Sequence, residues 1–102
     1  MVESYEALRN TFDWGEARTE LDGLPNGAGL NIAHEALDRH VAAGRADHVA
    51  IRWLPKRGEP VDLTYRTLTE QTSRFASALA DLGYTGGHGV ATLAGRVPDL
   101  YV

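Results

Sequence analysis

The sequence predicts an α/β fold made of an N-terminal helical extension, a β-hairpin and one βαβ unit. Three patterns predict it. Residues 48–54 and 61–65 are strand-like, the second with alternating apolar positions. Residues 66–82 repeat apolar side chains every three or four positions, as an amphipathic helix does. A short apolar run at 90–94 follows, of the kind buried in a parallel sheet.

The N-terminal third is predicted to be helical on both sides of a loop. Residues 3–21 carry two short amphipathic segments, separated by Asp13-Trp14-Gly15. Residues 22–30 are rich in glycine, proline and asparagine, which disfavour a helix. Asn31 is a suitable cap for a helix over 32–43, and Gly44 is a suitable terminator.

The second half is predicted to supply the sheet. Strands 48–54 and 61–65 form an antiparallel hairpin across a turn at 55–59. The helix over 66–82 begins with a capping signature from Thr67 to Glu70, or one turn earlier with Thr64 as the cap. A strand at 90–94 would complete a right-handed, parallel βαβ unit, and the residues from Pro98 read as the first turn of a further helix.

Composition narrows the class of protein. The chain has 102 residues, of which 43% are hydrophobic and 24% charged, values typical of one small folded domain. Its formal net charge is −4, and the ten Lys and Arg are scattered, so we expect neither a nucleic-acid nor a membrane partner. Without cysteine, a secretory signal or a long apolar stretch, the sequence predicts a cytoplasmic location.

Two glycine-rich segments could suggest phosphate binding. A phosphate loop follows a strand and opens a helix, whereas residues 83–89 close a helix and lead toward the predicted strand. They also lack the Lys-Ser/Thr pair of a P-loop. We therefore predict that residues 83–89, and likewise 27–29, are turns.

One helical pair could suggest a metal site. His34 and Asp38 are four residues apart and could face one ion, but no third ligand is recognisable in the sequence. The serines do not lie in a nucleophile elbow, and most carboxylates fall on predicted solvent faces. The sequence thus predicts no catalytic, cofactor-binding or metal-binding residue in this chain.

A series of segments resembles the start of the AMP-forming acetyl-CoA synthetases, a branch of the acyl-adenylate-forming superfamily. The similar segments, in the family's order and spacing, are 5–14 with the loop after it, 30–33, 37–40, 49–53, 63–68, 74–79, 82–83 and 96–101. No single segment is specific, but the series covers nearly the whole chain. One departure is Gly87-His88-Gly89-Val90, where the family usually has Gly-Asp-Arg-Val.

The resemblance implies that residues 1–45 are the family's helical N-terminal extension and 46–102 the truncated start of its AMP-dependent synthetase/ligase domain. It implies ATP, Mg²⁺ and CoA for the full-length enzyme, with all the functional residues beyond the position of Val102. The chain is then an incomplete piece of the large N-terminal domain, not catalytic by itself. Its implied partner is the missing remainder of the synthetase.

Two other interpretations stay open. The chain could be an assembly module that docks on a separately encoded remainder of the enzyme. It could also be an independent α+β protein with an unrelated small ligand, whose tight binding would raise the melting temperature.

Overall fold

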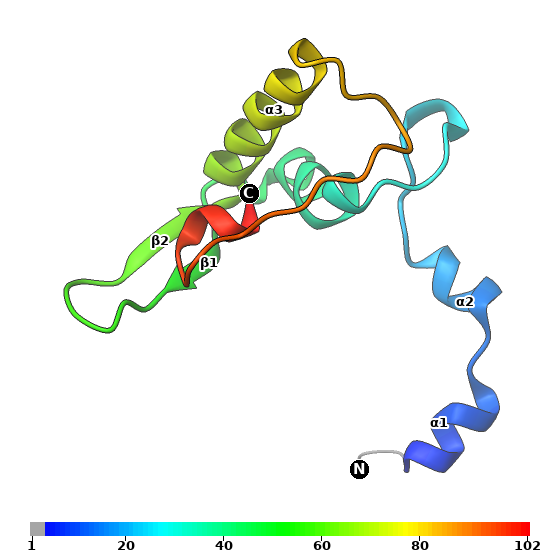
Figure 1. Cartoon of the computed structure of the whole chain (residues 1–102). Helices are drawn as coiled ribbons and strands as arrows, with labels where there is room; N and C mark the ends of the chain where they lie inside the picture. The colour runs from blue at the N-terminus through cyan, green and yellow to red at the C-terminus, as the bar shows by residue number, and fades with distance from the viewer. Residues whose placement is uncertain (1–3) are drawn as a thin grey trace. The chain divides into compact units, whose positions relative to one another are not determined.

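The chain separates into two units, Met1–Ala36 and Leu37–Val102, and the computed structural model describes residues 4–102. Figure 1 shows the first unit as short helices joined by extended segments, and the second as a hairpin with one long helix. We describe each unit by itself.

The first unit begins with two capped helices. In α1 (Tyr5–Thr11), the Ser4 hydroxyl accepts a hydrogen bond from the third residue after it, at 3.3 Å. In α2 (Trp14–Thr19), the Asp13 carboxylate does the same at 3.0 Å. The two predicted helical segments are confirmed from residue 4 onward, and residue 3 of the predicted range lies outside the described residues. The predicted separator is shorter than expected, because Asp13 caps α2 and so places Trp14 and Gly15 inside that helix.

The loop predicted over 22–30 is confirmed, with one 3₁₀ turn in it, η1 (Pro25–Gly27). The loop is closed by a hydrogen bond from the Leu24 N–H to the Gly29 carbonyl, at 2.8 Å. Asn26 has a φ of 61°, in the left-handed region that asparagine tolerates better than most residues.

The helix predicted over 32–43 is also found. The Asn31 side chain caps it by accepting from the His34 N–H at 3.0 Å. The helix then includes two wider π turns, η2 (His34–Asp38) and η3 (Val41–Arg45). Gly44, with a φ of 81°, leaves the right-handed helical region, so it terminates the helix as predicted.

The second unit is organised around an antiparallel hairpin of β1 (Val49–Trp53) and β2 (Val61–Thr64). Ile51 pairs with Leu63, and Trp53 pairs with Val61. The register shifts between Val49 and Ile51, which is a bulge near the start of β1. The predicted hairpin is therefore confirmed.

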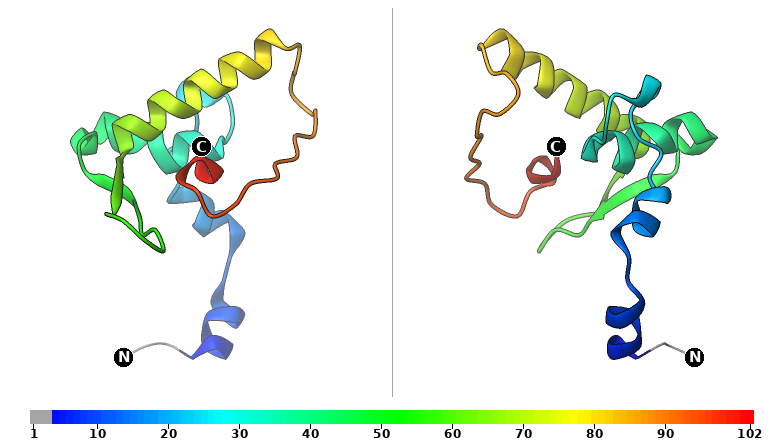
Figure 2. Two further views of the ribbon diagram at one scale, coloured as in Figure 1. Left: turned by 60° about the vertical axis from the view of Figure 1, so that its left-hand side comes forward. Right: turned by 90° about the vertical axis from the view of Figure 1, so that its right-hand side faces the viewer.

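The long helix α3 (Tyr65–Asp81) follows β2 directly and is capped by the Thr64 hydroxyl, which accepts from the Thr67 N–H at 3.2 Å. Of the two predicted caps, the earlier one is correct. Leu68 on α3 is only 2% exposed, and together with Leu63 and Ala46 it makes up the buried apolar group of the described residues. Figure 2 shows α3 running away from the hairpin, so its C-terminal half extends beyond this core.

The start of α3 is also tied to the segment before β1. The Arg66 N–H donates to the Ala46 carbonyl at 2.9 Å, and the Tyr65 N–H donates to the His48 carbonyl at 3.2 Å. These bonds fix the direction in which α3 leaves the sheet.

The predicted strand over 90–94 is wrong, and with it the βαβ unit. These residues have no strand conformation, and in the described chain the sheet has the order β1-β2 alone. A strand needs a neighbouring backbone for its hydrogen bonds, and none lies beside this run. Leu93 is accordingly fully exposed, at 105%. The broader prediction, that the chain is a small piece of an α/β fold, is confirmed. The helical turn predicted from Pro98 is present as the 3₁₀ turn η4 (Pro98–Tyr101).

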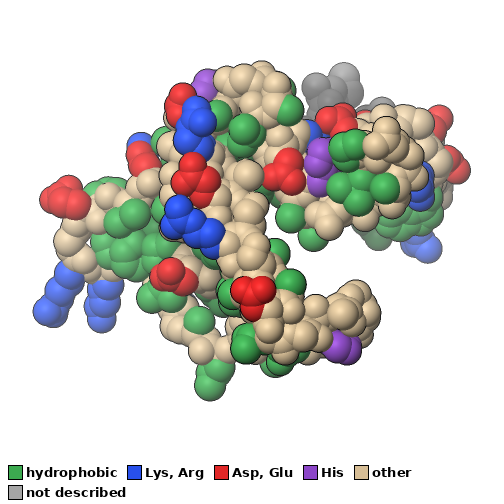
Figure 3. All heavy atoms as spheres, turned by 90° about the horizontal axis from the view of Figure 1, so that it is seen from above, with side chains coloured by type: hydrophobic (Ala, Val, Ile, Leu, Met, Phe, Trp, Pro, Cys, Tyr) green, Lys and Arg blue, Asp and Glu red, His purple; other side chains and the backbone are tan. Residues whose placement is uncertain are grey.

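Large apolar side chains are unusually exposed in both units. Figure 3 shows hydrophobic side chains at the surface, interspersed with charged ones. Among those more than half exposed are Tyr5, Phe12, Trp14, Ile32, Leu54, Leu82, Leu93 and Tyr101. Burial of such side chains is the main favourable term in folding, and here many of the large apolar side chains lie outside the small core.

Candidate functional site

The glycine-rich segment 83–89 is a turn, as predicted. The Tyr84 N–H donates back to the Leu79 carbonyl at 3.0 Å, which closes the C-terminus of α3. The His88 ring then accepts at Nδ1 from the Thr85 N–H at 3.2 Å. These glycines follow a helix and do not open one, so they do not present a row of N–H groups to a phosphate.

The glycines at 27 and 29 belong to a loop whose backbone N–H groups already bind a carboxylate of the same chain. The Glu35 carboxylate accepts from the Gly23 N–H at 2.7 Å with one oxygen and from the Asp22 N–H at 3.1 Å with the other. A negative charge at this position disfavours a second anion. Sequence reasoning missed this role of Glu35.

The metal site considered for His34 and Asp38 gains no further ligand. Within residues 4–102, no group of three or more His, Asp or Glu side chains lies close enough to hold an ion. Two of the serine hydroxyls make local hydrogen bonds. The Ser4 hydroxyl caps α1, and the Ser77 hydroxyl donates to the Ser73 carbonyl at 3.0 Å.

Two exposed ion pairs brace the second unit. Arg52 on β1 donates two hydrogen bonds of 2.7 Å to the carboxylate of Asp62 on β2, and Arg66 on α3 forks onto Asp47. The hydrogen bonds from Arg52 lower the pKa of Asp62, and those from Arg66 lower the pKa of Asp47. All four groups are solvent-exposed, which is typical of structural and not catalytic pairs.

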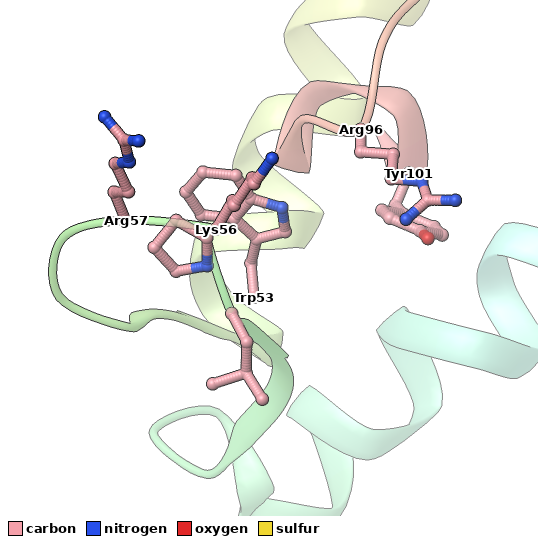
Figure 4. A pocket seen from close by; sticks show the side chains of 7 residues that line it. Trp53, Lys56, Arg57, Arg96 and Tyr101 are labelled. Atoms are coloured by element: carbon pink, nitrogen blue, oxygen red, sulfur yellow. The ribbon is translucent and has the colours of Figure 1, made fainter.

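One hollow is lined by several cationic and aromatic side chains. It lies between the hairpin turn and η4, and we call it the cationic hollow. Its volume is about 810 Å³, and it is lined by Trp53, Leu54, Pro55, Lys56, Arg57, Arg96 and Tyr101 (Figure 4). Cations that are about forty residues apart in the sequence thus line the same hollow, although they are scattered in the sequence. The sequence carries no signal for this, because it depends on where residues 95–101 return to the hairpin.

The described chain has no helix that is long and apolar enough to cross a membrane.

Comparison with known proteins places the chain in a class. The family model for AMP-binding enzymes matches residues 38–102, which is more than half of the chain. The chain therefore belongs to the AMP-binding enzyme family. The match starts within the helical segment before the hairpin, and the predicted domain boundary between residues 45 and 46 stays a prediction.

Within that class, the chain is similar to acetyl-coenzyme A synthetases. The protein of that name from Mycobacterium bovis is 42% identical over 94 residues, which cover 88% of this chain and 14% of the relative. The one from Streptomyces coelicolor is 37% identical over 92 residues, covering 87% and 13%, respectively. The one from Chlorobaculum tepidum is 40% identical over 77 residues, covering 76% and 12%. The chain thus spans only about an eighth of the length of these relatives. No solved structure matches it.

Proposed function

We propose that this chain is the N-terminal scaffold portion of an AMP-forming acetate–CoA ligase-like enzyme of the cytoplasm. The complete enzyme would use ATP to convert acetate or a related short acid into an acyl-adenylate, and would then transfer the acyl group to CoA. The observation that carries the proposal is the 42% identity with the Mycobacterium bovis acetyl-coenzyme A synthetase over 94 residues.

The local structure of the glycine-rich turns supports the proposed scaffold role. Adenylation needs preorganised donors around the reacting phosphate, and a Mg²⁺ ion held by oxygen ligands. The glycine-rich turns do not offer such donors, and residues 4–102 bring together no acidic cluster for the ion. We therefore derive no step of the reaction from these residues. Their contribution would be the packing of α3 on the hairpin.

A segment exchange tests this proposal. We would replace the aligned segment of the Mycobacterium bovis relative with this chain and measure acetate- and CoA-dependent pyrophosphate release. The chimera should be active, the relative with that segment deleted should not be, and the isolated chain should give only the blank rate. A folded but inactive chimera would refute the family role. Acetate-dependent turnover by the isolated chain would refute the scaffold role.

The second candidate function is an assembly module that docks on a separately encoded remainder of the enzyme. The exposed apolar side chains favour it, since Leu82 is 75% exposed and Leu93 is 105% exposed. Coexpression of this chain with the segment-deleted relative should then give a complex that coelutes in size-exclusion chromatography and regains activity. Elution of the two polypeptides apart, without activity, would exclude it.

A further inference from the structure

The cationic hollow combines three positive charges that the described chain does not neutralise. Its lining includes Lys56, Arg57 and Arg96 but no acidic residue. In residues 4–102 these three cations have no carboxylate within ion-pair distance, whereas Arg52 and Arg66 each fork onto an aspartate. In a chain whose net charge is −4, this is a local excess of positive charge.

The shape of the hollow argues against a single compact anion. Figure 4 shows Arg57 and Arg96 on opposite sides of Trp53, with Lys56 between them. Phosphate and isolated carboxylate sites converge their donors on one point, often with bidentate arginine. Cations spread along a hollow instead match several negative charges carried at intervals on one extended ligand.

The rest of the lining suits polypeptide side chains. Trp53 is half-buried, and Leu54 and Tyr101 are 69% and 63% exposed, so together they offer apolar surface between the cations. Tryptophan, tyrosine and arginine are the residues most enriched at the energetic centres of protein interfaces.

We infer that the cationic hollow is the docking site for an acidic polypeptide segment that carries apolar side chains between its carboxylates. The carboxylates contact Lys56, Arg57 and Arg96, and the apolar side chains cover Trp53 and its neighbours. Charge complementarity identifies this occupant, and the inference does not depend on the acetate reaction.

The fluorescence of Trp53 provides the test. The full chain is used with Trp14→Phe, which leaves Trp53 as the sole indole, and far-UV circular dichroism confirms the fold of each variant. The probe is a short peptide of alternating glutamate and leucine, with a glutamine-leucine peptide as its control. The test variant combines Lys56→Glu and Arg96→Glu. The control is Arg74→Glu, a single exposed charge reversal on α3 that is not part of the lining.

The glutamate peptide should shift Trp53 emission saturably, and its affinity should fall as salt is added, because exposed charges are screened. The double charge reversal should weaken binding by about tenfold or more, since it places like charges opposite each other. Arg74→Glu should leave it unchanged. Equal binding of the glutamine peptide, or equal effects of the test and control variants, would overturn the inference. Inorganic pyrophosphate that shifts Trp53 emission and displaces the peptide would overturn it in favour of a small-anion site.

Discussion

Replacing Leu68 with alanine should destabilise the second unit far more than the same change at an exposed leucine. Leu68 is 2% exposed, and fully burying a leucine side chain contributes about 1.5–3 kcal/mol. A cavity adds to the loss, and buried Leu→Ala changes cost about 2–5 kcal/mol. Only Leu63 and Ala46 share the buried group in the described chain, so the surroundings can relax, and we expect about 2–3 kcal/mol.

Leu82→Ala is the matched control. Leu82 is 75% exposed, so only about a quarter of its side chain is covered, and the expected cost is about 0.5 kcal/mol. Urea unfolding followed by far-UV circular dichroism measures both variants. A unit with so few buried side chains has a small free energy of unfolding, so Leu68→Ala should lower the urea midpoint much further than Leu82→Ala does. Equal unfolding midpoints for the two variants would refute the assignment of the core to Leu68.

Three further predictions follow from local contacts. Thr64→Ala removes the cap of α3 and should lower the free energy of unfolding in urea by about 1 kcal/mol. Thr64→Ser keeps the hydroxyl and should retain the wild-type value, and an unchanged free energy in Thr64→Ala would contradict the cap. The pKa of Asp62, followed by carboxyl NMR, should be lower in the wild type than in Arg52→Gln. Because this folded-state pKa is depressed, the pair stabilises the fold above about pH 4, and its effect disappears as the pH falls through the lowered pKa; identical titrations would exclude the pair. Glu35→Ala should speed amide hydrogen exchange in the loop over 22–30, and unchanged exchange would show that the carboxylate does not hold it.

Local signals in the sequence predicted most of the secondary structure. Asn31 and Gly44 bounded a helix correctly because a side-chain cap and a left-handed glycine act within one turn of the chain. The hairpin was also predictable, since alternation and a short turn specify an antiparallel pair. The choice between Thr64 and Thr67 as cap was open, and the structure favours Thr64 because it leaves β2 with extended backbone, as a cap residue must.

Features that depend on distant residues were not predictable in this way. The run over 90–94 has the composition of a buried strand, but a strand forms only where a neighbour supplies its hydrogen bonds. Glu35 closes its loop from twelve residues away, and no helix or turn rule anticipates that contact. The cationic hollow joins the hairpin turn to η4, so its residues share no motif. The proposed absence of catalytic residues was argued from motifs alone and stays a prediction.

The pairing of β1 and β2 has a consequence for how the purified chain should be handled. Within the described residues each of these strands pairs with one neighbour only, so the amide donors and carbonyl acceptors on its outer side are not taken up by a third strand. Such an edge is a ready template for a strand of another molecule. Concentration should therefore promote self-association through the backbone, and keeping the chain dilute should preserve the hairpin as it is.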